Sequence, residues 1–394
     1  MNRRIFVVDD QEELLETTTA VLRAIDKTWE VTGFKNPLDA LDAVREIPPD
    51  ALITDQMMPE RKGSELLEQI RAIAPLTIRI IMSGYLAPET LALITSAHQY
   101  LAKPFQLLEL KHLIERSFAA QKRIVNDELQ VVVGSIRAIP SLPHIHHSLV
   151  AKLKDDESPT EGIARLIGAD PGITAKVLQL ANSPLFGRSF VVTEVMEAVN
   201  CLGTELITAV ILSQSVFQKY EGIKVQEVDP GRVWSHSWET ACLAQHICRE
   251  QGLSRQQGDE AFLAGLLHEV GRFVLLDNFT EQYRNAYEAA VHDQIPLPAQ
   301  LREVFQTTPT RLSAYVLELW GLPASAVNGI FFMDNPENDP EPEFSVSSAL
   351  YIAHHLASRT FAPDSSVPEE LNLNYLKAIG CEESIHEWQN ATVT

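Results

Sequence analysis

Charged side chains directly follow apolar runs in the first quarter of the chain, and this pattern most constrains its fold. Residues 5–8 form an unbroken apolar run that ends in Asp9 and Asp10, and Asp55 and Lys103 follow two later runs. Continuous Val/Ile runs are typical of parallel strands buried on both faces, and ligands of an open α/β sheet lie beyond the carboxyl ends of its strands. We therefore expect these four side chains to converge at one edge of a sheet.

Three carboxylates at one sheet edge predict a cation site. Crowded carboxylates repel one another unless a hard cation lies between them, and Mg²⁺ prefers a shell of a few carboxylates and water. The sequence therefore predicts a Mg²⁺ pocket at Asp9, Asp10 and Asp55, with Lys103 beside it. The plainer alternative is that Asp9 and Asp10 only end a solvated strand and that Asp55 is a turn residue.

The first domain is predicted to be a doubly wound α/β domain with a five-stranded parallel sheet, because apolar runs alternate with helical periodicity. The expected strands lie around 5–8, 29–33, 51–54, 78–82 and 99–102.

Residues 52–59, with Gly63 beyond them, resemble the phosphoacceptor strand and loop of two-component response regulator receiver domains. The resemblance implies that Asp55 accepts a phosphoryl group from a sensor histidine kinase. It also implies that Asp9, Asp10, Asp55 and the backbone carbonyl of Met57 hold Mg²⁺.

Further positions of the resemblance lie at the next two strands. It implies that Ser83 and Lys103 bind the phosphoryl oxygens and that Tyr100 is an aromatic switch that turns inward. It also assigns Met57 and Tyr85 to the tuning of phosphoaspartate lifetime. Metal and ammonium would act by electrostatic stabilisation, since the attacking carboxylate and the phosphoryl oxygens are all negative.

The charge of the chain is concentrated in its second half. Residues 1–124 hold 15 Lys and Arg against 18 Asp and Glu, and the rest holds 17 against 35, for a net charge of −21. A DNA-binding output domain normally carries a basic patch, so we expect no nucleic-acid partner. Four cysteines without a CxxC pair, together with no apolar run long enough for a signal peptide or membrane span, predict a cytoplasmic protein without a membrane partner.

Apolar spacing continues from Gln106 to Gly134 without a helix breaker. This spacing predicts one long helix, which either couples the two halves or pairs between protomers, or simply packs on its own sheet. The domain boundaries that follow are a receiver at 1–122, a linker helix at 123–138, an all-α output domain at 139–360 and a C-terminal helical extension at 361–394.

Beyond Pro140 the pattern is helical only. Asp170 reads as an N-cap with Pro171 at the first helical position, followed by apolar residues on one side of the helix. Further helices are expected at about 204–217, 232–251, 259–277, 281–292, 310–320, 323–333 and 344–359.

Several segments of this half resemble the HDOD output domain, a relative of the HD phosphohydrolases. The motifs that carry the resemblance lie at 139–143, 169–174, 180–187, 198–203, 234–237, 264–272 and 319–323. Active HD enzymes hold one or two metals with histidines and an aspartate. Here the resemblance places His236 and the pair His268 and Glu269 at that site.

This metal site looks degenerate. Glu269 replaces an aspartate, Pro309 stands where relatives carry a histidine, and Met333 and Asp334 stand where they carry a histidine pair. Neither Pro nor Met is a plausible ligand for a hard metal. We therefore expect no cofactor in the HDOD domain and treat His236 and His268 as hydrogen-bonded core residues.

Other polar residues of this half have structural explanations. Arg272 can pair with Glu269 on one helix, and His354 and His355 are expected to be one inward and one exposed, since adjacent helical residues point about 100° apart. A second histidine group, near residue 145, has no carboxylate nearby in the sequence. It comprises His144, His146 and His147.

The leading hypothesis is a response regulator, a homodimer, whose HDOD domain is not an enzyme and signals through an unidentified downstream protein. The alternative is a phospho-regulated, metal-dependent phosphodiesterase of a nucleotide second messenger, suggested by the HDOD resemblance alone. A transcription factor conflicts with the acidic second half.

Overall fold

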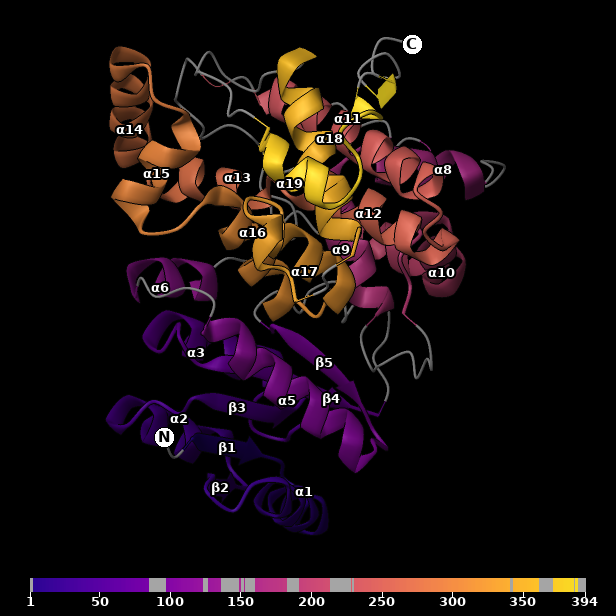
Figure 1. Ribbon diagram of the computed structural model, residues 1–394. Helices are drawn as coiled ribbons and strands as arrows, with labels where there is room; N and C mark the ends of the chain where they lie inside the picture. Colours follow the sequence, from indigo (N-terminus) through magenta and orange to yellow (C-terminus); the bar gives the residue numbers. More distant parts are fainter. Residues whose placement is uncertain are drawn as a thin grey trace.

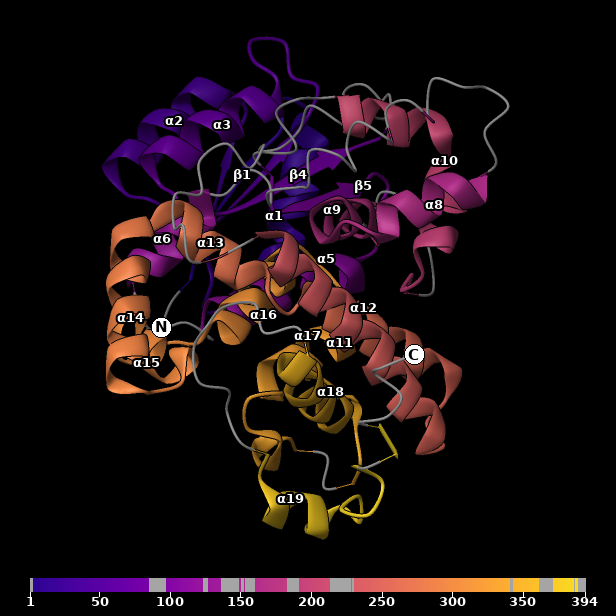
Figure 2. The same cartoon turned by 90° about the horizontal axis from the view of Figure 1, so that it is seen from above.

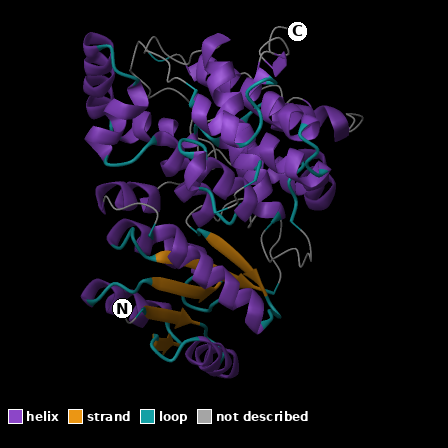
Figure 3. Cartoon of the chain, viewed as in Figure 1, coloured by secondary structure: helices purple, strands orange, loops and turns teal. Residues whose placement is uncertain are grey.

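A parallel sheet lies at one end of the molecule and helices fill the other (Figures 1 and 3). The computed structural model describes residues 3–84, 97–122, 127–135, 149, 152, 160–182, 191–212, 228, 230–340, 343–360, 371–385 and 387–388. Within these ranges, no helix is both long enough and apolar enough to cross a lipid bilayer.

The sheet has five parallel strands in the order β2-β1-β3-β4-β5. The strands are β1 (Arg4–Val8), β2 (Glu30–Phe34), β3 (Ala51–Asp55), β4 (Ile78–Ser83) and β5 (Gln99–Ala102). The predicted five-stranded parallel sheet is therefore confirmed. Val8 is paired with Thr54, and Ser83 with Ala102, so the strands end at a common edge.

Helices cover both faces of the sheet, as a doubly wound fold requires. They are α1 (Glu12–Ile25), α2 (Pro37–Glu46), α3 (Gly63–Ile73) and α5 (Leu107–Gln121). α1 contacts α5 and α2 contacts α3, and Figure 2 shows these two pairs on opposite sides of the strands.

The expectation of one helix running from 106 to 134 is wrong. α5 ends before Lys122, and a separate helix, α6 (Asp127–Ser135), lies beside α3 (Figure 1). The buried Arg79 guanidinium donates to the Gly134 carbonyl at 2.5 Å and so ties α6 to β4. Three roles were considered for this stretch: coupling of the two halves, pairing between protomers, and packing on its own sheet domain. The contacts of α6 with α3 and β4 agree with the third.

The second half is helical throughout its described ranges. Its helices are α8 (Thr160–Gly168), α9 (Pro171–Ala181), α10 (Val195–Leu212), α11 (Pro230–Glu250), α12 (Arg255–Leu267), α13 (Val270–Asn278), α14 (Thr280–Asp293), α15 (Leu297–Phe305), α16 (Pro309–Leu319), α17 (Ala324–Phe332), the 3₁₀ turn η3 (Pro336–Asn338), α18 (Val346–Thr360) and α19 (Leu373–Ala378). α11, α12 and α18 pack on one another and form the centre of this half.

α9 lies between the sheet and the rest of the helical half. Its Asp170 N-cap is confirmed, because that carboxylate accepts from the Ile173 N–H at 2.9 Å. Burial is not confined to the side with the expected apolar residues, because every residue from Pro171 to Ala181 is buried. The sheet domain covers the side that would otherwise face water, and this side carries the polar residues Lys176 and Gln179.

The stretch expected as one helix at 259–277 is two helices, α12 and α13, and α15 was not expected at all. Ser313 of α16 explains the break. Its hydroxyl donates to the His268 carbonyl at 2.5 Å and accepts from the Gly271 N–H at 2.7 Å, so these backbone groups bond outside their own helix. Gly271 also lies so close to α16 that a Cβ there would be 2.1 Å from the Pro309 carbonyl oxygen.

Candidate functional sites

The acidic edge of the sheet is assembled around one lysine. Lys103 Nζ lies 2.6 Å from Asp9 Oδ2 and 2.5 Å from Asp55 Oδ1. Asp9 follows β1, Asp55 ends β3 and Lys103 follows β5, so three strand ends supply these groups. The fourth expected residue, Asp10, comes directly after Asp9 at the same strand end.

Charge holds this lysine protonated. Burial alone would lower the pKa of Lys103, but hydrogen bonds and charges from Asp55 and Asp9 outweigh burial and raise that pKa. The Asp55 carboxylate has a second fixed contact, because its Oδ2 accepts from the Met57 N–H at 2.6 Å. The Met57 side chain itself is exposed.

A hard cation fits this edge. Asp10 Oδ1 is buried and lacks a hydrogen-bond partner in the described part of the chain, and Asp10 directly follows Asp9. A buried carboxylate oxygen without a donor is costly unless a cation or water satisfies it. Carboxylate oxygens from Asp9, Asp10 and Asp55 are the donor type that Mg²⁺ prefers.

The residue expected to bind phosphoryl oxygens, Ser83, and the expected switch residue, Tyr100, lie on adjacent strands of the sheet. Ser83 ends β4 and is buried, and Tyr100 lies in β5 with its side chain 1% exposed. Burial raises the pKa of the Tyr100 hydroxyl, which keeps it protonated. Tyr85 lies outside the described residues.

Tyr100 also contacts the helical half directly. Lys176 of α9 donates to the Tyr100 hydroxyl at 3.4 Å and to Gln179 Oε1 at 2.9 Å. Gln179 in turn donates to the His98 carbonyl at 3.2 Å. Lys176 is buried, its pKa is lowered to about 8 by burial, and no carboxylate pairs with it within the described ranges. The sequence offered no sign of this contact.

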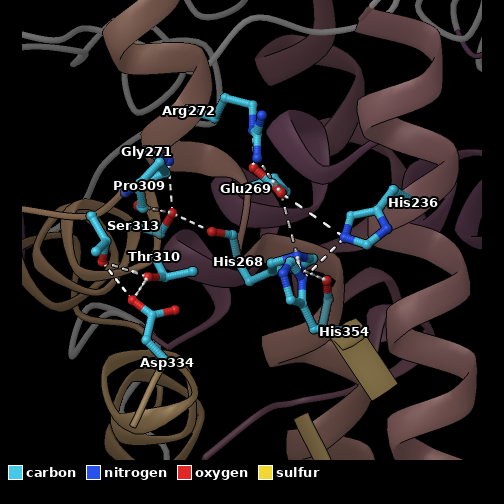
Figure 4. A network of polar contacts seen from close by, with 12 residues as sticks. His236, His268, Glu269, Gly271, Arg272, Pro309, Thr310, Ser313, Asp334 and His354 are labelled. Carbon is cyan, nitrogen blue, oxygen red and sulfur yellow. Dashed lines mark hydrogen bonds and ion pairs between the residues drawn. The ribbon is translucent and has the colours of Figure 1, made fainter. Parts of the chain in front are cut away.

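A second polar cluster lies inside the helical half (Figure 4). It joins His236 of α11, His268 and Glu269 at the α12–α13 break, and His354 of α18, with one ligand atom of each within 4.8 Å of the others. His354 Nδ1 is 3.1 Å from both His236 Nε2 and His268 Nε2. Glu269 Oε1 is 3.6 Å from His268 Nε2 and 4.0 Å from His236 Nε2.

Burial keeps these imidazoles neutral. It lowers the pKa of His236 and of His354 well below the usual value, and at His236 the positive charge of Arg272 adds to the effect. Burial also lowers the pKa of His268, with Glu269 opposing it. For Glu269, burial alone would raise the pKa, but the positive charge of Arg272 and its hydrogen bonds lower it.

Arg272 holds the glutamate in place. Its Nε donates to Glu269 Oε2 at 2.6 Å and its Nη2 to Glu269 Oε1 at 3.2 Å, so the expected pairing on one helix is present. Arg272 Nη1 also donates to the Tyr283 hydroxyl at 3.1 Å.

The expectation for the two histidines of α18 is wrong in part. His354 points into the cluster, as an inward position would, but His355 is not exposed: it is buried and lies 2.8 Å from the Tyr351 carbonyl oxygen. Both sides of α18 are covered, one by α11 and the other by the segment that carries α19 and Tyr375, which contacts Tyr351. The separation of about 100° between adjacent helical residues therefore did not place His355 at the surface.

The positions expected to be lost ligands have other roles. Asp334 Oδ2 accepts from the Thr308 hydroxyl at 2.6 Å and from the Thr310 hydroxyl at 2.5 Å, which ties α17 to the start of α16. Pro309 begins α16, and Met333 is buried in the core. The histidines expected to have no carboxylate nearby, His144, His146 and His147, lie outside the described residues.

Comparison with protein families gives two matches along the chain. Residues 5–115 match the response regulator receiver domain, and residues 139–336 match the HDOD domain. Together the matches define the class: a response regulator in which a receiver domain precedes an HDOD domain. The second match covers half of the sequence, and the chain belongs to the HDOD family.

Curated relatives match over parts of their length. A protein of Treponema pallidum (strain Nichols) described as uncharacterized is 25% identical over 231 residues, which cover 57% of this chain and 43% of that protein. The DNA-binding response regulator MtrA of Mycobacterium leprae is 35% identical over 111 residues, which cover 28% of this chain and 48% of MtrA. The chain thus spans less than half the length of these relatives.

Solved structures share the fold. The MmoQ response regulator from Methylococcus capsulatus str. Bath has a TM-score of 0.50 at 24% identity, with 64% of this chain and 98% of that chain covered. A virulence factor from Campylobacter jejuni subsp. jejuni has a TM-score of 0.51 at 18% identity, with 68% and 98% covered. At these identities the likeness concerns the fold alone.

Proposed function

We propose that this protein is a response regulator that a sensor histidine kinase phosphorylates on Asp55, and that its HDOD domain transmits the change through contacts with another protein. The observation that carries the proposal is the placement of Lys103 between Asp9 and Asp55 at the common edge of the sheet. A lysine held in contact with both carboxylates can neutralise a phosphoryl group that arrives at either one.

The chemistry is nucleophilic attack by a carboxylate. An Asp55 oxygen forms a bond to phosphorus while the bond from phosphorus to the kinase histidine nitrogen breaks. Lys103 and the Met57 N–H hold the two oxygens of Asp55, so the attacking group is oriented beforehand. Mg²⁺, bound through Asp9, Asp10 and Asp55, would supply charge neutralisation at the phosphoryl oxygens. Ser83 and Lys103 would then hydrogen-bond the new phosphoryl oxygens.

We infer that the signal leaves the receiver through Tyr100. In the structure its hydroxyl meets Lys176 of α9, whereas Ser83 lies on the neighbouring strand. Drawing Ser83 toward a phosphorylated Asp55 favours an inward turn of Tyr100. That turn removes the contact with Lys176 and leaves a buried amine with one partner fewer. Phosphorylation thereby weakens the docking of β5 on α9.

The test of the phosphoacceptor is direct. The full chain is incubated with Mg²⁺ and a small acyl phosphate, and the phosphoryl adduct is measured by intact mass. We expect the wild type and Asp42→Asn, a change at an exposed helix position that pairs with Arg45, to acquire one hydroxylamine-labile adduct. Asp55→Asn should acquire none. A labile adduct on Asp55→Asn, or none on folded wild type, contradicts the proposal.

A further inference from the structure

The ring nitrogens of the histidine cluster do not carry enough protons for every close contact among them to be a hydrogen bond. His268 Nδ1 lies 2.6 Å from the Gly265 carbonyl oxygen, so this nitrogen carries the proton and, in a neutral ring, Nε2 carries a lone pair. That lone pair faces His354 Nδ1, which also faces His236 Nε2.

One proton cannot serve both of these contacts well. If His354 Nδ1 carries a proton, that N–H can point straight at only one of its two neighbouring nitrogens. The contact with the other nitrogen is then poorly aligned. If it carries none, two nitrogen lone pairs face each other at 3.1 Å across the contact with His268. Three ring nitrogens and a carboxylate oxygen thus converge on one point, and they carry too few protons to hydrogen-bond one another at every contact.

The spacing of these atoms is that of a four-coordinate metal site. Metal–nitrogen bonds of about 2.0–2.1 Å in a tetrahedron place the ligand atoms about 3.3–3.4 Å apart. Four of the six separations among these atoms are 3.1, 3.1, 3.6 and 4.0 Å, and all four atoms lie within 4.8 Å of one another. Movement of the Glu269 carboxylate toward the histidines would complete the tetrahedron.

The surroundings orient these ligands. The Gly265 carbonyl fixes the tautomer and ring position of His268, and the two donors of Arg272 fix the carboxylate of Glu269. Metal-ligating histidines and carboxylates have outer partners of this kind. Arg272 is held in turn by Tyr283, so the arrangement extends from α11 to α14.

We propose that His236, His268, Glu269 and His354 bind one zinc ion, or another late first-row divalent ion, which ties α11, the α12–α13 break and α18 together. Three imidazoles and one carboxylate favour such an ion over Mg²⁺. Four protein ligands leave no position for a reactive water, which makes the ion structural instead of hydrolytic. This proposal goes beyond signalling and does not depend on phosphorylation of Asp55.

The test uses full-length protein without a histidine tag. After exposure to Zn²⁺ and gel filtration, bound metal is measured by mass spectrometry, and affinity is measured by competition with a chromophoric chelator. We expect one tightly bound zinc in the wild type and more than about tenfold weaker binding in His354→Ala. His355→Ala is the matched control, because that neighbour lies on the same helix and bonds to the Tyr351 carbonyl.

Further readouts separate the site from general stability and from the receiver. Visible absorption of the Co²⁺ form should show tetrahedral coordination in the wild type and in Asp55→Asn. Chelation should lower the melting temperature of the wild type and not that of His354→Gln, which keeps a polar side chain in case His354→Ala does not fold. Equal zinc affinity in His354→Ala and the wild type, or no retained zinc in folded wild type, overturns the proposal. So does hydrolysis of a phosphodiester by the zinc-loaded protein that is lost in His354→Ala.

Discussion

At the scale of single residues, Lys176 opposes the docking of the two domains. Its amine is buried in the interface and is bonded to Gln179 and Tyr100, which are neutral groups. Burial lowers the pKa of Lys176 from 10.5 to about 8, a depression worth on the order of 3 kcal/mol at neutral pH. Because the protonated amine of Lys176 regains its hydration when the interface opens, its burial makes the interface easier to open.

Replacing Lys176 by Met should therefore stabilise the protein at pH 7. The folded amine binds fewer protons than the unfolded amine between pH 8 and pH 10.5, so its penalty is complete below pH 8 and disappears as the pH rises toward 10.5. We expect Lys176→Met to gain about 1–3 kcal/mol in urea unfolding at pH 7 and much less at pH 10.

An exposed lysine provides the control for this comparison. Lys111→Met, on the surface of α5, should change stability by less than about 0.5 kcal/mol at either pH. A Lys176→Met protein that is less stable than the wild type at pH 7 would show that the two hydrogen bonds of Lys176 outweigh its burial.

Which residues of the candidate sites could be predicted depends on the range of their contacts. Asp9, Asp55 and Lys103 each end a local apolar run, and the topology of a parallel sheet brings such ends together. His354 meets His268 from 86 positions away in the sequence, and this contact depends on how α18 packs on α11 and α12. Helical periodicity specifies a face of a helix and not its neighbour, so His354 was missed.

At the scale of elements, strands were predictable and helix ends were not. Each strand is an apolar run whose length is set locally, and all five lie within two residues of their predicted positions. The ends of α5 and α12 depend on groups distant in sequence, because Arg79 binds the α6 backbone and Ser313 binds the backbone at the α12–α13 break. Local spacing predicts continuous helices at both places.

The position of α6 rests on close packing that a single methyl group would prevent. A Cβ at Gly134 would lie 2.0 Å from the Pro75 carbonyl oxygen, a backbone atom that cannot move aside easily. We expect Gly134→Ala to lower stability by more than about 1 kcal/mol and to increase hydrogen exchange in α6.

Gly168→Ala, at the end of α8, is the control for this change. Its Cβ would meet only Val195 Cγ2, at 4.0 Å, so no loss is expected. Wild-type stability and exchange in Gly134→Ala would mean that α6 is not held against the loop after α3 in solution.

At the scale of the whole molecule, β5 joins the two domains to the acidic edge of the sheet. Gln99 donates to the Leu319 carbonyl at 2.8 Å, Tyr100 meets Lys176, and Lys103, just after the strand, meets Asp55. A shift of β5 toward the acidic edge therefore acts at once on α9 and on the end of α16. The histidine cluster lies among α11, α12, α13 and α18 and need not change with it.

Opening of this interface should be visible by hydrogen exchange. With Mg²⁺ and beryllofluoride, a mimic of the phosphoryl group, we expect faster exchange in peptides covering α9 and the end of α16, because both lose the cover of β5. Peptides of α11 and α18 should keep their protection and serve as the internal control. Asp55→Asn should show no change, since the mimic needs that carboxylate. If α9 becomes more protected in the wild type, phosphorylation tightens the docking, and the direction proposed for the switch is reversed.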